Sequence, residues 1–186
     1  MKKSKKYRKF LKDCIKQRKQ VYISRTKLKD EHMSAIPAKI SRQLLLVQYL
    51  LDFHVDGFKV IRLSDLTDIR RNEIEIFHDE IMEKEGLLDT LYVPDVAIDD
   101  WKDFFASIMK MDKMVAVSLE RKEKGRSFFL GKVKKVKEKS IQLLYMDVYG
   151  DYEEKTTKIC YKDITLVDFD DRYSEMYDKY GRKEIG

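Results

Sequence analysis

The chain of 186 residues is poor in cysteine, proline and glycine. With 2 Cys, 2 Pro and 7 Gly, it has neither the cysteines of a disulfide framework nor the composition of a long flexible linker. Neither Cys14 nor Cys160 has a histidine beside it in the sequence. We therefore interpret Cys14, which lies on an apolar helix face, as a packing residue rather than as a reactive thiol.

Long apolar runs are also absent. No segment approaches the roughly 20 consecutive apolar residues that a membrane-spanning helix needs. The lysine-rich start is not followed by the apolar stretch of a signal peptide. We expect a cytoplasmic protein that has no membrane partner.

The motifs of common catalytic and cofactor sites are missing as well. The sequence contains no glycine-rich phosphate loop, no nucleophile elbow and no His-Glu-x-x-His segment. His32, His54 and His78 are not spaced as metal ligands. Asp65 and Asp163 each precede a short apolar segment, where a carboxylate usually accepts hydrogen bonds from turn amides. We expect no metal, no cofactor and no enzymatic activity.

Charged and apolar residues are plentiful instead. The 43% hydrophobic and 11% aromatic content is enough for a globular protein. The net charge of +6 is uneven, because residues 1–29 hold 13 of the 39 Lys and Arg residues but a single acid, Asp13. This distribution favours contact with nucleic acid or with an acidic partner, including another subunit. A solvated lysine-rich helix face would show the same distribution.

Two segments of the chain match each other without a gap, residues 7–24 and 101–118. Both have apolar residues at the i, i+3, i+4, i+7 and i+8 spacing of one helix face, and Cys14 falls opposite Ile108. Weaker matches with small shifts follow at 34–40 with 127–133, 47–52 with 142–147, 65–67 with 163–165, and 80–86 with 175–181. Chance similarity between two amphipathic segments is the alternative. We favour a duplicated module of about 90 residues.

The duplication divides the chain into four parts. We predict a basic N-terminal arm (1–6), a first helix-plus-barrel repeat (7–88), a linker (89–98) and a second helix-plus-barrel repeat (99–186). The predicted class is α+β, mainly β, with two tandem five-stranded small barrels that are each preceded by an amphipathic helix.

The second copy shows its elements most clearly. We expect a helix over 100–114, strands over 114–120, 127–137, 140–149, 155–160 and 164–169, and a closing helix over 171–180. Gly131 is interpreted as a bulge or bend within the second strand.

The first copy repeats this plan. Its third strand is expected over 44–53, followed by a turn at 54–57 and a strand over 58–63. Asn72 is expected to cap a closing helix. The apolar face of that helix should use Ile74, Phe77, Ile81 and Met82.

The segment Ile159-x-x-x-Asp-Ile-Thr-x-Val167, with a helix that feeds five short strands, resembles the Sm-like small barrels. SH3-like barrels share the strand order and the turn before the last strand. Leu144-Tyr-Met-Asp147 is similar to part of the first Sm signature. The resemblance implies a small barrel, and RNA held by an Asp and an Asn of the first motif and an Arg-Gly of the second.

This chain departs from that pattern at the positions which hold RNA. Asp147 stands where the Asn of the first motif is expected. The second motif has Ile159-Cys160 in one copy and Ile61-Arg62-Leu63 in the other, without an Arg-Gly. The departure argues against RNA binding by the usual ring pore, and the fold that the resemblance implies does not depend on it.

Two clusters of cations are the candidate nucleic-acid contacts. They are Lys5, Lys6, Arg8, Lys9, Lys12, Lys16, Arg18 and Lys19 near the N-terminus, and Arg121, Lys122, Lys124 and Arg126 in the second copy. Lysines then continue at 132, 134, 135, 137 and 139. Together with Tyr145 or Tyr149 they would line a groove for a single strand, or they protect an exposed edge strand from aggregation. We favour the edge interpretation.

These observations predict a non-enzymatic binding or assembly module. RNA or DNA is one candidate partner, bound through the basic N-terminal arm and helix. The alternative is a structural or protein-interaction protein that binds no nucleic acid. In that case, exposed strand edges would recruit further copies or a partner by strand addition.

Overall fold

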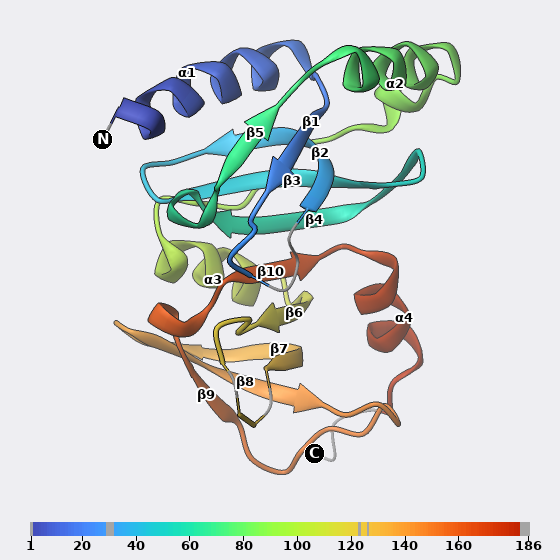
Figure 1. Cartoon of the computed structure of the whole chain (residues 1–186). Coiled ribbons are helices and arrows are strands. Elements are labelled where there is room, and N and C mark those ends of the chain that lie inside the picture. Colours follow the sequence, from blue (N-terminus) through green and yellow to red (C-terminus); the bar gives the residue numbers. More distant parts are fainter. Residues whose placement is uncertain (1, 29–31, 123, 126, 183–186) are drawn as a thin grey trace. The chain divides into compact units, whose positions relative to one another are not determined.

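The computed structural model describes residues 2–28, 32–122, 124–125 and 127–182, and side chains from residue 7 onward (Figure 1). The chain divides into two compact units, Met1–Pro94 and Asp95–Gly186. The boundary falls inside the predicted linker 89–98. No helix among the described residues is long and apolar enough to span a bilayer.

The first unit combines two helices with a five-stranded sheet. Its elements are α1 (Lys2–Gln17), β1 (Val21–Ser24), β2 (His32–Ile40), β3 (Leu44–Leu51), β4 (His54–Arg62), the 3-10 turn η1 (Leu63–Asp65), β5 (Asp68–Arg70), α2 (Glu73–Lys84) and the 3-10 turn η2 (Leu87–Thr90). The strands are antiparallel, in the order β5-β1-β2-β3-β4. Because α1 already begins at Lys2, residues 2–6 of the predicted arm belong to this helix.

The second unit repeats the order of the first. Its elements are α3 (Trp101–Lys110), β6 (Met114–Ser118), β7 (Phe128–Val136), β8 (Ser140–Met146), β9 (Thr157–Cys160), the 3-10 turn η3 (Tyr161–Asp163), β10 (Leu166–Phe169) and α4 (Arg172–Tyr180). Its strands are antiparallel in the order β10-β6-β7-β8-β9, in which each strand has its counterpart in the first unit.

The sheets remain open. Among the described residues, no pairing joins β5 to β4 in the first unit, or β10 to β9 in the second. The mixed content of helices and strands agrees with the predicted α+β class, whereas the predicted closure into five-stranded barrels is not seen. Within each unit, the first and the last strand of the strand order have a single partner each.

Corresponding backbone details recur in both units. Arg18 and Asp112, after the first helix of each unit, both have a φ of 51°. The amide of Thr67 donates to the Ser24 carbonyl at 2.9 Å, as the amide of Thr165 does to the Ser118 carbonyl at 3.0 Å. Cys14 and Ile108 are both buried, at 5% and 0% exposure. Burial also raises the pKa of the Cys14 thiol, which fits a packing residue.

The strand register corrects two of the weaker sequence matches. β2 has a bulge between Pro37 and Lys39, and β7 has one between Val133 and Lys135. Ser34 lies opposite Leu50, and Leu130 lies opposite Met146. Ser34 therefore corresponds to Leu130 and Leu50 to Met146, so the sequence alignment is displaced by three residues in β2 and by one in β3.

Gly131 is not the site of the bulge, which lies two residues further on. A Cβ atom at this position would lie 2.0 Å from the carbonyl oxygen of Leu144 on β8. The glycine therefore permits a close approach of two strands.

Two predicted features of the first unit are also placed differently. The turn between the third and fourth strands is Asp52-Phe53, because β4 already begins at His54 and Leu51 pairs with His54. Gly57, expected in that turn, lies within β4 at an irregularity of the register and has a φ of 63°.

Helix α2 is rotated relative to the prediction. Asn72 caps it as expected, and the Glu75 carboxylate completes the capping box by accepting from the Asn72 amide at 2.7 Å. Met82 is buried, but Ile74 and Phe77 of the predicted apolar face are exposed, Phe77 by 59%. The polar side chains of Glu75 and Asp79 take the inward positions instead, and each is 2% exposed.

Candidate nucleic-acid interface and the cavity of the first unit

The N-terminal basic residues form an exposed face of α1. Lys9, Lys12 and Lys16 are exposed and follow one another at helical spacings of three and four residues. Arg18, just beyond the helix, is exposed as well. Asp13 is the one acid among described α1 side chains. This side of α1 therefore carries a nearly uniform positive charge.

The remaining predicted residues near the N-terminus have other surroundings. The side chains of Lys5 and Lys6 lie outside the described residues. Arg8 donates from Nη2 to the carbonyl oxygen of Arg42 at 2.5 Å. Lys19 lies with its Nζ 3.7 Å from the buried carboxylate of Asp79. Arg8 and Lys19 thus hold α1 against the rest of its unit.

The second cation cluster lies in the other unit. Arg121, Lys122 and Lys124 are exposed in the loop between β6 and β7. Arg126 lies outside the described residues. This loop and α1 belong to different units, so we treat their cations as two separate sets.

The lysine-rich strand β7 is not an edge strand, because it pairs with both β6 and β8. The interpretation of its lysines as protection of an edge is therefore wrong. Lys132 is held by Asp112 and Asp178, with its Nζ 3.0 Å from each carboxylate. Burial acts to lower the pKa of Lys132, but the hydrogen bonds to both carboxylates outweigh it and raise the pKa to about 12.

The two tyrosines proposed as stacking partners for these lysines differ in exposure. Tyr145 is half-buried and packs edge-to-face against Phe129. Tyr149 is exposed in the loop after β8. Among the two, Tyr149 alone presents most of its ring to solvent.

A small cavity lies beside the end of α1. It has a volume of about 70 Å³ and is lined by Ile15, Arg18, Ile36, Pro37, Ala38, Gln48, Leu91, Tyr92 and Val93. The ring of Tyr92 is 51% exposed and rests edge-on against the buried Phe58. An exposed aromatic ring thus lies next to a basic side chain that ends the cationic face.

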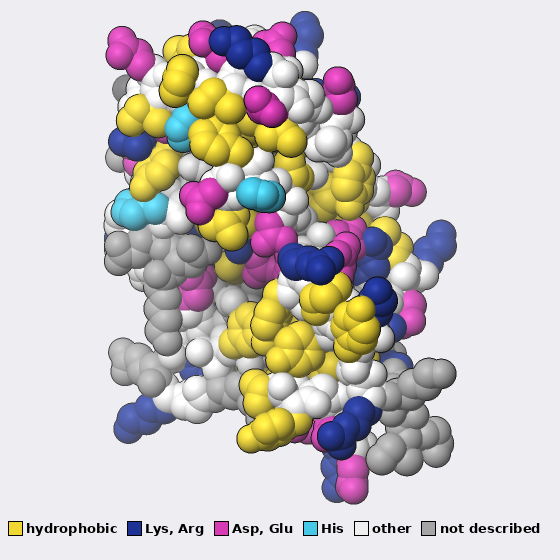
Figure 2. Space-filling model, turned by 90° about the vertical axis from the view of Figure 1, so that its right-hand side faces the viewer, with side chains coloured by type: hydrophobic (Ala, Val, Ile, Leu, Met, Phe, Trp, Pro, Cys, Tyr) yellow, Lys and Arg dark blue, Asp and Glu magenta, His cyan; other side chains and the backbone are white. Residues whose placement is uncertain are grey.

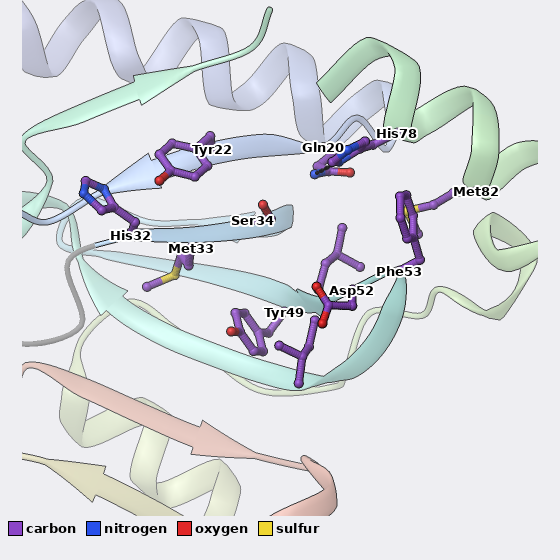
Figure 3. A pocket seen from close by; sticks show the side chains of 12 residues that line it. Gln20, Tyr22, His32, Met33, Ser34, Tyr49, Asp52, Phe53, His78 and Met82 are labelled. Carbon is purple, nitrogen blue, oxygen red and sulfur yellow. Dashed lines mark hydrogen bonds between the residues drawn. The ribbon is translucent and has the colours of Figure 1, made fainter. Parts of the chain in front are cut away.

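A larger cavity lies between α2 and strands β1 to β3 (Figure 3). Its volume is about 290 Å³, and it is lined by Gln20, Tyr22, His32, Met33, Ser34, Tyr49, Leu50, Leu51, Asp52, Phe53, His78 and Met82. Figure 3 shows Gln20 beside His78 at the helix end of the cavity, and Tyr22 beside His32 at the opposite end. The Ser34 hydroxyl points into the space between these two pairs.

Hydrogen bonds fix the polar lining at the helix end. Gln20 is only 2% exposed, and its Nε2 lies 3.4 Å from Nδ1 of His78. The backbone amide of Gln20 donates to the carboxylate of Asp79 at 3.1 Å. Asp79 also pairs with Arg71 at 2.6 Å. This buried network explains the orientation of α2, because it turns the polar residues of the helix inward.

Aromatic rings and cations surround the rest of the cavity. His32 stacks on Tyr22 with ring centroids 5.4 Å apart. The guanidinium carbon of Arg70 lies 4.2 Å from the centroid of Tyr22, and Nζ of Lys59 lies 4.4 Å from that of Tyr49. The lining therefore offers apolar surface, aromatic rings and several uncharged polar groups.

The turn at the mouth of the cavity is strained. Asp52 and Phe53 have φ values of 46° and 67°, and two such residues form the central pair of a type I′ hairpin turn. Glycine or asparagine normally occupies these positions, and the left-handed region is unfavourable for a bulky residue such as phenylalanine. The turn holds the Phe53 ring edge-on to His78, with ring centroids 4.9 Å apart.

The sequence reasoning missed this cavity. His32 and His78 were noted only because they lack metal-ligand spacing, and the described residues contain no group of side chains suited to hold a metal ion. The two histidines, His32 and His78, are far apart along the chain, and the fold alone brings them to one cavity. The one available signal was their absence from the second copy.

We compared the chain with protein-family models, curated proteins and solved structures, and none of these comparisons found a match. The function must therefore be argued from the chain itself.

Proposed function

We propose that the protein is a non-enzymatic binding module that contacts single-stranded nucleic acid, with RNA as the first candidate, through the basic face of α1. The observation that carries the proposal is the row of exposed cations Lys9, Lys12, Lys16 and Arg18, interrupted by one acid. Such a row can follow a phosphate backbone, and the release of condensed counterions then drives binding.

The surroundings of this face support a single strand rather than a duplex. Tyr92 lies exposed at the small cavity next to Arg18. A ring beside cations is the arrangement on which an unpaired base stacks, and a base inside a duplex cannot reach it.

The Sm-like or SH3-like small-barrel resemblance remains part of the proposal. Each unit has five antiparallel strands with a single 3-10 turn before the last strand, η1 in one and η3 in the other. These features support the resemblance, although each sheet is open. RNA binding by a ring pore is not proposed, because the motifs that would hold RNA there are missing.

The test is a salt titration of binding to a fluorescent single-stranded RNA. Each phosphate contact should contribute about −0.7 to the slope of log affinity against log salt. Replacing Lys9, Lys12 and Lys16 by glutamine should weaken binding and make the slope less negative by about 2, which is three contacts at this value.

A matched control separates the effect of where the cations lie from the effect of the net charge on binding. The triple glutamine variant of Arg121, Lys122 and Lys124 removes the same charge from the second unit. It should leave the slope nearly unchanged. Equal losses in both variants, or binding that does not depend on salt, would contradict the role of α1.

One observation favours the alternative of a protein-interaction module. Helix α2 exposes Ile74, Ile76 and Phe77, and Figure 2 shows hydrophobic side chains gathered beside histidines on this side of the first unit. Exposed apolar patches often mark protein contacts. Under this alternative, light scattering should give a mass above that of the single chain, and Phe77→Glu should restore the monomer.

A further inference from the structure

We propose that the larger cavity of the first unit holds one unstacked nucleobase and reads its edge. The inference rests on the proposed function, because the base would belong to the strand that follows α1. The cavity lies between α2 and strands β1 to β3, whereas the cations that carry the proposed function lie on the exposed face of α1. It is therefore a separate site of this chain.

The size of the cavity suits a single base. Pockets for drug-sized ligands usually have volumes of about 300–1,000 Å³, and this one, at about 290 Å³, lies just below that range. A flat heterocycle fits such a space, whereas a cofactor as large as a dinucleotide does not.

The lining matches the chemistry of a base edge. Gln20 and Ser34 offer both donors and acceptors, and the Asp52 carboxylate is an acceptor at the mouth. Unpaired bases are recognised by hydrogen bonds to their edges and by aromatic side chains against their faces. The Phe53 ring, 37% exposed, provides such a face.

A cationic ligand is disfavoured at the same place. Aromatic rings attract a quaternary ammonium group through their faces. Here Arg70 already lies over Tyr22, and Lys59 over Tyr49. A further cation between these rings would be repelled by both, while a neutral heterocycle would not.

The second unit provides an internal comparison. By strand register, Leu130 takes the place of Ser34, and Tyr177, six residues after the α4 cap, takes the place of His78, six residues after the α2 cap. Leu130 belongs to a buried cluster with Met114, Ala116 and Met146, against which Tyr177 packs. The polar lining is therefore particular to the first unit and is not required by the shared fold.

The end of α4 packs against this cluster as well. A Cβ at Gly181 would lie 2.5 Å from the Cε of Met146. Gly181 is the tenth residue after the α4 cap, and the tenth residue after the α2 cap is Met82, which lines the cavity. The second unit thus fills this position with apolar side chains, whereas the first unit has a cavity there.

The strained turn gives independent support. Phe53 stays in the left-handed region although glycine would fit there without strain. Backbone strain of this kind persists where the surrounding structure requires a particular side chain, often at binding sites. The side chain that the strain positions here is the ring at the cavity mouth.

The basic face ends two residues before the first residue that lines the cavity. Arg18 ends that face and lines the small cavity, while Gln20, two residues later, lines the larger one. Ile36 separates the two, because it lines the small cavity and packs with Leu50 and Met82 of the larger one. A strand bound along α1 can therefore place one base in the cavity.

The experiment measures binding of ten-nucleotide oligo-A, oligo-C and oligo-U by fluorescence anisotropy. The full chain should prefer one base. Ser34→Leu, which installs the residue of the second unit, should lower affinity for the preferred oligomer by about tenfold, toward the low end of what a stacked base contributes. The preference should then disappear, while the salt slope stays the same.

A second variant keeps the test valid if Ser34→Leu fails to fold. Phe53→Gly suits the left-handed turn, so the protein should remain folded and lose the same preference. As the matched control, Lys12→Gln with Lys16→Gln should weaken binding of all three oligomers alike and keep the preference. Unchanged affinity and preference in both cavity variants, with a normal salt slope, would overturn the cavity assignment alone.

Free nucleosides test whether the cavity binds a base that is not part of a strand. Ligand-observed NMR with adenosine, guanosine, cytidine and uridine should show binding that Ser34→Leu abolishes. If nucleosides bind in this way but no oligomer binds with a salt slope, the cavity assignment stands and the proposed function fails. If neither nucleosides nor oligomers bind, both are overturned.

Discussion

At the scale of single residues, the neighbouring strand determines which residue fits at position 131. β8 runs so close to β7 that a Cβ at this position would overlap the carbonyl oxygen of Leu144. In the first unit the corresponding residue, paired with Tyr49 as Gly131 is with Tyr145, is the buried Ala35. The same strand position thus accepts a methyl group in one unit and excludes it in the other.

The first prediction follows from this contact. Gly131→Ala should destabilise the protein by about 1–3 kcal/mol, because the added methyl group meets backbone that cannot rotate away. Chemical denaturation followed by circular dichroism measures the change. Ala35→Gly is the reciprocal control and should cost about 0.5–1 kcal/mol through backbone entropy. A neutral or stabilising Gly131→Ala would show that the strands separate easily.

At the scale of elements, α2 shows why a hydrophobic pattern can mislead. Ile74, Phe77, Ile81 and Met82 have helical spacing, and the sequence gives no sign that Ile74 and Phe77 face solvent. The helix is instead oriented by polar contacts. Glu75 completes the cap, and Asp79 binds Arg71 and the amide of Gln20. These partners lie up to 59 residues apart, so periodicity cannot reveal them.

The second prediction reverses the usual order of mutational effects. Asp79→Asn should cost about 3 kcal/mol, because it leaves the partly buried Arg71 without its carboxylate partner. Phe77→Ser should stay within about 0.5 kcal/mol, as an exposed substitution does. Thermal unfolding of both variants measures the difference. A large loss for Phe77→Ser with a small one for Asp79→Asn would mean that α2 packs as its apolar pattern suggests.

At the scale of the whole molecule, the duplication made most of the plan predictable. Each predicted strand of the second copy overlaps an observed one, from β6 to β10. The alignment failed inside β2 and β3, because bulges at Pro37 and Val133 shift the register without any signature in composition. Closure into barrels was wrong as well, since strand number and bending alone do not determine whether the edges of a sheet meet.

The candidate sites were predictable only in part. The cations of α1 are visible as a charge run, and the helix places Lys9, Lys12 and Lys16 on one side. The cavity is not visible in this way, since its lining comes from four elements and a turn. At the corrected register, the polar Ser34 is equivalent to the apolar Leu130. This difference between the two copies is the signal that would have drawn attention to the cavity.

The third prediction concerns how the two units respond to a ligand. Each unit is compact by itself and has its own buried cluster, so we expect them to unfold independently. A ligand that binds only the folded first unit stabilises it by about 2.7 kcal/mol at a concentration of 100 Kd. The slowest amides of β2 and β3 should then exchange about a hundredfold more slowly with bound oligonucleotide, and those of β7 and β8 should not change. Hydrogen exchange measured by mass spectrometry checks this. Equal slowing in both units would mean that the chain unfolds as one cooperative body, and slowing confined to β7 and β8 would place the nucleic acid on the second unit instead.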